Sequence, residues 1–182
     1  MNRCRCIMGL MVALTVFCSS AHVGFAQSSL ADETLASVAM AESAVADAKA
    51  SIKRGKELVS LIPEDSPMLP EVAQMLKQVS MNWKLAVESI ENANESSAKI
   101  ASTTSEELAG DYALLAKVNA TVAVSGAEVV QIGMAYVEAV ASENTEALDM
   151  IRSTMRNALA ASSQVKMNCD KVKKLISQKY SK

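Results

Sequence analysis

Apolar residues recur at steps of three and four along most of this chain, with an average period of about 3.5 residues. The repeat runs through four stretches, from Val38 to Ile62, from Val72 to Ile100, from Leu108 to Val140 and from Leu148 to Ile176. Heptads sustained over this length are typical of helices that pack side by side as in a coiled coil. Extended to the breaks that flank it, each stretch predicts a helix of roughly 33 to 38 residues, which is ~50 Å long at the usual rise per residue.

Three short breaks separate the four stretches. All three prolines fall within residues 63–70, and this segment is predicted as a loop because proline inside a helix costs ~3 kcal/mol. Residues 102–107 hold two overlapping capping boxes that begin at Thr103 and Thr104, and Asn144 is a candidate N-cap for the last helix. Four long helices with such short connections predict an all-α fold, an antiparallel up-down-up-down four-helix bundle with long coiled-coil-like helices.

The third stretch is the most apolar, and it is therefore predicted to be the most buried helix. Its seam carries Gly126 and Gly133 one heptad apart, and each glycine sacrifices ~1 kcal/mol of helix propensity. Close packing of a neighbouring helix is the expected compensation, and a ligand above the glycines is the alternative. Residues 118–124 alternate like a strand, but the heptad continues through them, so the prediction remains helix.

Residues 1–26 have the pattern of a secretory signal peptide. Two arginines precede an apolar run of about eleven residues, which is too short to span a membrane, and Ala26 ends a sequence suited to signal peptidase. Cleavage after Ala21, lipidation of Cys18 and an uncleaved anchor are the alternatives. The predicted mature chain, residues 27–182, is a single domain without a transmembrane segment, exported to a periplasm or the extracellular space.

The residue types of the predicted mature chain exclude several classes of function. It has no histidine and one cysteine, so it cannot form a Ser-His-Asp triad, a histidine-based metal site, a c-type haem attachment or an internal disulfide. Eight methionines show no tight repeat and are interpreted as core residues rather than Cu(I) ligands. We therefore expect a protein that is not an enzyme and holds no cofactor or metal. Its 16 basic and 20 acidic residues give a net charge near −4, which provides no nucleic-acid footprint.

Six residues are candidate functional positions. The candidate ligand or close-packing positions are Trp83, Asn119, Gly126, Gly133 and Tyr136. Asn119 lies on a helix seam, where one polar residue can fix register or oligomeric state. Cys169 lies on the last seam, where it is either a small buried hydrophobe or a thiol that pairs with a second copy.

Basic residues gather near the ends of the first and fourth helices, where they meet the helix dipole favourably. In an antiparallel bundle the first set, from Lys49 to Lys56, lies at the opposite end from the second set, from Lys166 to Lys182. The second set is also a candidate for weak contact with an anionic surface such as lipid headgroups or acidic glycan.

No motif in the chain identifies a family. The outline is similar, at the level of the fold alone, to exported four-helix bundles in general, including bacterial sensor and periplasmic chaperone domains. We predict an exported, non-enzymatic helical protein that acts as a binding, scaffold or chaperone-like module on another protein or on itself. The alternative is a small-molecule-binding four-helix bundle with its ligand between helices. A central cavity would favour the ligand, and a fully packed core with an exposed apolar stripe would favour the binding module.

Overall fold

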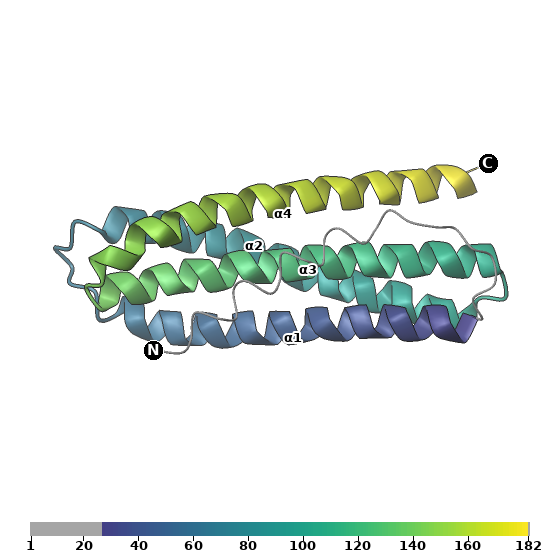
Figure 1. The fold of residues 1–182 in the computed structure, drawn as a ribbon, viewed down its shortest axis with the longest axis horizontal. Helices are drawn as coiled ribbons and strands as arrows, with labels where there is room; N and C mark the ends of the chain where they lie inside the picture. Colours follow the sequence, from purple (N-terminus) through teal and green to yellow (C-terminus); the bar gives the residue numbers. More distant parts are fainter. Residues whose placement is uncertain (1–26, 182) are drawn as a thin grey trace.

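The computed structural model describes residues 27–181, and these form four α-helices joined by short connections (Figure 1). The helices are α1 (Gln27–Val59), α2 (Leu69–Ser102), α3 (Glu106–Ala141) and α4 (Thr145–Tyr180). The all-α four-helix bundle predicted from the heptads is confirmed, and the strand-like residues 118–124 lie inside α3. The predicted signal peptide lies outside the described residues.

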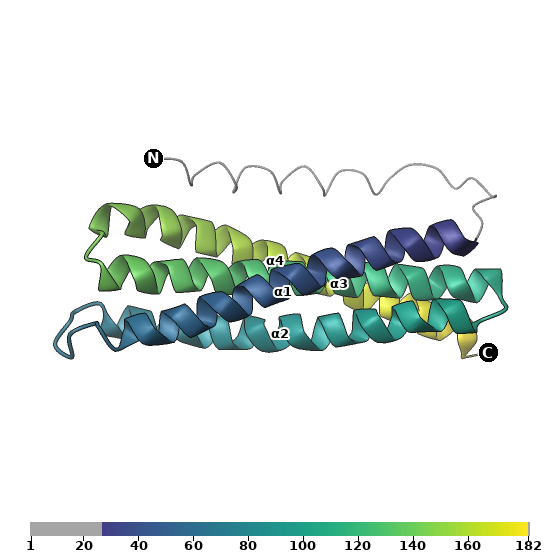
Figure 2. The same cartoon turned by 90° about the horizontal axis from the view of Figure 1, so that it is seen from below.

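Ion pairs and the path of the chain give the helix directions. Glu33 pairs with Lys117 near one end of α1 and α3, and Arg54 pairs with Glu138 near the other end, so these two helices are parallel. Figures 1 and 2 show α2 and α4 running in the opposite direction. Consecutive helices therefore alternate in direction along the bundle.

α3 is the central helix. Its backbone lies against α1, α2 and α4, whereas among the four described helices α4 makes no backbone contact with α1 or α2 (Figures 1 and 2). α3 has seventeen buried residues against five in α4, so the prediction that the third helix is the most buried is confirmed. By length and composition α3 could also cross a membrane, but more than half of its most apolar window is buried by the rest of the bundle.

Local sequence signals set the helix ends. Pro70 lies in the first turn of α2, where its missing N–H is not needed. α3 is capped by Ser105, whose hydroxyl accepts a backbone N–H of the first turn at 3.3 Å. The N-caps predicted at Thr103 and Thr104 are therefore wrong, because Ser105 is the residue close enough to the helix to accept that bond. Asn144 precedes α4 as predicted, but its side chain makes no capping hydrogen bond.

The hydrophobic core consists of three clusters along the bundle. The largest lies where the α1–α2 and α3–α4 connections meet, and all four helices contribute to it. The two smaller clusters are built mostly from alanine and draw on α1, α2 and α3. Leu159 is the last α4 residue that packs against any of the three. The C-terminal half of α4 therefore lies beyond these three clusters, although its Cys169 is buried against α3.

Candidate functional site on α4

α4 is divided into two halves by its relationship to the core. The N-terminal half places Leu148, Met155 and Ala158 in the largest cluster. Beyond Leu159, no described residue of α4 joins a hydrophobic cluster, although the helix continues to Tyr180. The two halves are therefore held to the bundle by different forces.

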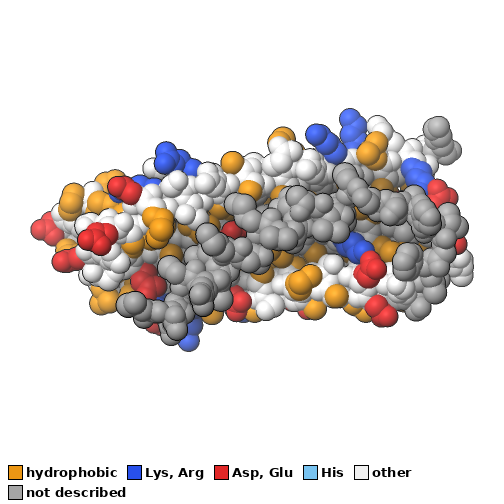
Figure 3. Space-filling model, in the orientation of Figure 1, with side chains coloured by type: hydrophobic (Ala, Val, Ile, Leu, Met, Phe, Trp, Pro, Cys, Tyr) orange, Lys and Arg blue, Asp and Glu red, His pale blue; other side chains and the backbone are white. Residues whose placement is uncertain are grey.

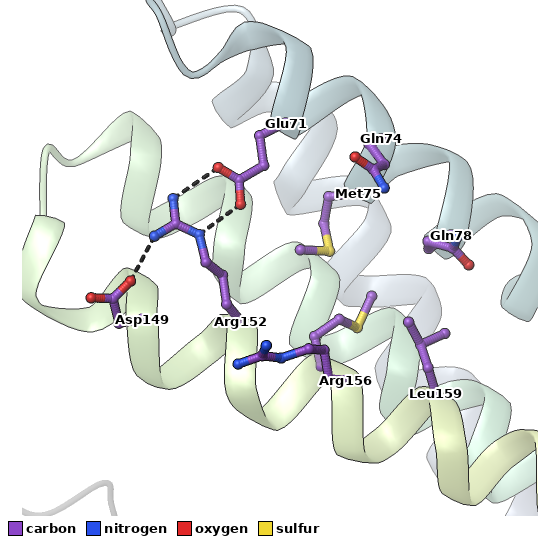
Figure 4. Close-up of a pocket in the computed structure, with 9 residues that line it drawn as sticks. Glu71, Gln74, Met75, Gln78, Asp149, Arg152, Arg156 and Leu159 are labelled. Carbon is purple, nitrogen blue, oxygen red and sulfur yellow. Dashed lines mark hydrogen bonds and ion pairs between the residues drawn. The ribbon is translucent and has the colours of Figure 1, made fainter.

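Arg152 ties the N-terminal half of α4 to α2 (Figure 4). Its Nε donates to Glu71 Oε1 at 2.6 Å and its Nη2 donates to Glu71 Oε2 at 2.8 Å, while Nη1 donates to Asp149 Oδ1 at 2.7 Å. The two-pronged contact with Glu71 is a strong geometry for an arginine and a carboxylate. Hydrogen bonding by Arg152 lowers the pKa of Glu71 below its ordinary value of 4.5, although partial burial opposes the shift. The pair is therefore fully ionised at neutral pH.

Tyr136 of α3 completes this cluster. Its side chain is fully buried, its ring centre lies 5.8 Å from the guanidinium carbon of Arg152, and its hydroxyl accepts a hydrogen bond from Arg152 Nη2 at 3.5 Å. Burial, together with a hydrogen bond to Glu71, raises the pKa of Tyr136 to about 12. A phenol with such a pKa is a poor proton donor or acceptor at neutral pH. We interpret the cluster as a structural clasp between α2, α3 and α4.

An open groove with a volume of about 420 Å³ lies between α2 and α4 beside the clasp (Figure 4). Apart from the clasp residues, the groove is lined by Gln74, Met75, Gln78, Met155, Arg156 and Leu159. Among the described residues Arg156 has no carboxylate within ion-pair distance, unlike Arg152. The groove therefore combines an apolar surface with two amides and a free guanidinium.

Two buried asparagines face α4 at successive levels of the bundle. Asn82 on α2 and Asn119 on α3 each donate a side-chain N–H to the carbonyl four residues earlier in their own helix, at 2.9 Å and 2.8 Å. Each amide oxygen accepts a hydrogen bond from α4, Asn82 from Ser162 Oγ at 3.4 Å and Asn119 from Cys169 Sγ at 3.6 Å. Polar pairs on a helix seam fix its register, because a shifted helix would leave buried polar groups unpaired.

The far end of α4 is tethered to α3 by polar contacts. Lys179 Nζ donates to Asp111 at 2.6 Å and pairs with Glu107 at 2.7 Å, and the hydroxyl of Tyr180 donates to the same Asp111 oxygen at 2.7 Å. The pair with Glu107 is exposed and contributes about 0–1 kcal/mol, whereas the side chain of Asp111 is only 18% exposed and forms the firmer part of this tether. The ion pair between Arg54 of α1 and Glu138 lies near the opposite end of α3 from Lys179. The prediction that the basic groups of α1 and α4 lie at opposite ends of the bundle is therefore confirmed.

The C-terminal half of α4, beyond Leu159, leaves apolar side chains in solvent. Met167 is 50% exposed and Leu175 is 66% exposed, while Val172 and Ile176 are partly covered. Isolated exposed apolar residues are ordinary on protein surfaces, but here they occur on a segment that no hydrophobic cluster supports. This half of α4 is therefore the candidate interaction surface.

Charge is divided unevenly between α4 and the rest of the chain. Residues 27–144 hold 17 acidic and 8 basic residues, a net charge of −9, whereas α4 holds 3 acidic and 7 basic residues, a net charge of +4. Within the described residues, neither Lys171 nor Lys174 has a carboxylate within ion-pair distance. In Figure 3, basic side chains stand along the upper edge over α4, and acidic side chains lie at both ends and along the lower edge.

None of the predicted ligand positions lines the groove between α2 and α4. α2 fills the space above both glycines, because a Cβ on Gly126 would lie 2.9 Å from the backbone oxygen of Asn82 and one on Gly133 would overlap Val79. Trp83 is half-buried against the largest core cluster and does not line the groove. These positions pack the bundle, as Tyr136 and Asn119 do.

Cys169 is 3% exposed and points toward α3. Burial raises the pKa of its thiol, and nearby Lys173 offsets only part of that effect. The thiol could form a bond to a second copy only if α4 moved away from α3. Of the two alternatives predicted for Cys169, a small buried hydrophobe or a thiol paired with a second copy, the structure shows the buried residue.

Sequence reasoning missed the clasp and the groove. Glu71 directly precedes the seam residue Val72, and Arg152 directly follows the seam residue Ile151. Charged residues that flank a seam on two different helices are the positions from which interhelical ion pairs form. Opposite charges at these flanking positions were the available signal.

No family model, curated protein or solved structure matches this chain. Among residues 27–181, the histidine, cysteine, aspartate and glutamate side chains form no group that could hold a metal ion. The fold and surface define an all-α four-helix bundle whose last helix is basic and partly unsupported by the core.

Proposed function

We propose that this chain is an exported, non-enzymatic binding module that contacts its partner through the outer face of α4. The outer face comprises the exposed residues Arg156, Ala160, Ser163, Met167, Lys171, Lys174, Leu175 and Gln178. The observation that carries the proposal is the end of the core at Leu159, after which α4 continues for about six more turns. Ser162, Cys169, Lys179 and Tyr180 bond this extension to the other helices, and most of its residues are exposed and available to a partner.

The packing of the interior also favours a surface function. Gly126 and Gly133 bring α3 into close contact with α2, and alanines fill the smaller clusters. The described interior is thus occupied by the protein's own side chains. A partner is then met at the surface, where export through the predicted signal peptide would place α4 in a periplasm or outside the cell.

A photo-crosslinking residue tests this proposal in intact cells. It replaces Leu175 on the outer face of α4 or, as a matched control, Leu61 in the α1–α2 connection, since both side chains are 66% exposed. Adducts of any class, protein or lipid, are identified by mass. We expect specific adducts at Leu175 and not at Leu61. Equal yields at the two sites, or none at Leu175, would refute the proposal, and an exported form that keeps Met1 would refute the signal peptide.

The groove between α2 and α4 favours a second candidate function, the binding of a small ligand. Its apolar lining and the free guanidinium of Arg156 suit a carboxylate with an apolar chain. Decanoate is a suitable probe, and we expect it to raise the melting temperature of the native protein but not of Arg156→Ala. The same shift in both proteins would exclude this mode of binding.

A further inference from the structure

We propose that the partner of the outer face of α4 is an anionic lipid surface. This inference rests on the proposed function, because both use the same face of the helix. The chemistry it requires is a row of unpaired cations, a few apolar side chains that reach the headgroup region, and no competing carboxylates on the same face.

The cations of the outer face extend along one side of α4. Arg156 and Lys174 are eighteen residues apart, so they span ~27 Å of helix, and Lys171 lies between them. Between Arg156 and Gln178 the only acidic residue of α4 is Asp170, which pairs with Lys166 at 3.1 Å, and one heptad before Arg156 the exposed Asp149 pairs with Arg152. The charges on this face are therefore free to interact with anions outside the protein.

The apolar residues of the outer face are spaced for a surface rather than for a partner helix. Met167 and Leu175 are eight residues apart, or ~12 Å, and Lys171 and Lys174 lie between them along the chain. A partner helix requires apolar residues at continuous steps of three and four, whereas Ala160 and Ser163 precede Met167 on this face. Separate apolar side chains flanked by lysines suit insertion at the headgroup boundary.

The acidic body of the protein does not prevent this contact. α3 lies between α1 and α4, and each helix is ~10 Å wide. The acidic residues of α1 are therefore more than a Debye length of ~8 Å from a surface that touches α4. Nearer acids at the C-terminal end, Glu107 and Asp111, are paired with Lys179. The charge imbalance orients the protein with α4 toward the anionic surface.

Vesicle binding tests the inference directly, with protein produced from the full chain. We expect the protein to sediment with equimolar phosphatidylcholine and phosphatidylglycerol vesicles, to dissociate as salt is raised, and to ignore pure phosphatidylcholine vesicles. Lys171→Glu with Lys174→Glu should lower the partition coefficient by at least ~tenfold. The matched control, Lys49→Glu with Lys53→Glu, makes the same charge change on exposed positions of α1 and should have little effect.

A second pair of variants tests the apolar contribution. Met167→Ser with Leu175→Ser keeps every charge and should still weaken vesicle binding. Helical circular dichroism confirms that each variant is folded. The inference is overturned if folded protein does not bind anionic vesicles, if both lysine pairs weaken binding equally, or if the serine variants bind unchanged. Protein adducts at Leu175 without vesicle binding would overturn the lipid partner and leave the proposed function standing.

Discussion

The thiol of Cys169 on α4 donates a hydrogen bond to the side-chain oxygen of Asn119 on α3, with 3.6 Å between the two atoms. One heptad earlier on α4, Ser162 makes the equivalent bond to Asn82 on α2. α4 is therefore aligned against two different helices by polar side chains. A shift of α4 by one heptad would place either Ile176 beside Asn119 or Met155 beside Asn82, and one buried asparagine would lose its partner on α4, whereas apolar seam contacts alone would tolerate the shift.

The environment of Cys169 predicts a slowly reacting thiol. Thiolate is the reactive form, and burial both raises the pKa of this thiol and blocks reagent access. We expect iodoacetamide to modify the native protein at least ~tenfold more slowly than the same protein in guanidinium. A dimer band on nonreducing electrophoresis, removed by reductant, would instead show that α4 leaves α3 and that Cys169 links two copies.

Two glycines on α3 should respond in opposite ways to alanine. A Cβ on Gly126 would lie 2.9 Å from the backbone oxygen of Asn82, which cannot move as a side chain can, whereas a Cβ on Gly110 would meet nothing within 4 Å. Gly110→Ala should raise the free energy of unfolding by up to ~1 kcal/mol through helix propensity. Gly126→Ala should lower it by about 1 kcal/mol despite the same gain in propensity. Urea unfolding measures both, and two stabilised variants would show that α2 does not pack against Gly126.

The heptad pattern predicted the fold because each helix buries one continuous apolar stripe. Gly126 and Gly133 could be placed on a seam from spacing alone, but whether α2 or a ligand filled the space above them depended on the neighbouring helix. The central position of α3 was signalled by its apolar composition. The unsupported half of α4 was not signalled, because its heptad continues to Ile176 although the core cluster ends at Leu159. Apolar spacing reports the face a helix can bury and not the partner available to bury it.

The ion pair between Glu71 and Arg152 should make stability depend on pH. The folded pKa of Glu71 is lowered from its ordinary value of 4.5, so the pair stabilises the native state above that value and is lost as pH falls through the lower folded pKa. Glu71→Gln should cost about 1 kcal/mol at neutral pH, toward the lower end for such a pair because about a third of each side chain is exposed. Melting temperatures measured from pH ~7 to ~3 should converge for the native protein and the variant. If the melting temperatures of the native protein and the variant differed by the same amount at every pH, the carboxylate of Glu71 would not be the source of the difference.

Hydrogen exchange should divide α4 into the two halves that the core defines. Local opening is easiest where few apolar contacts must break, and α4 joins no described cluster beyond Leu159. Amides of α4 from residue 165 onward should therefore exchange at least ~tenfold faster than those around Met155. The control is α3 at the same end of the bundle, where Ala109 and Ala113 are buried with α2 and should stay protected. Fast exchange in both helices would indicate fraying of the whole end, and uniform protection along α4 would show that its polar contacts to α3 hold the outer half as firmly as the core holds the inner half.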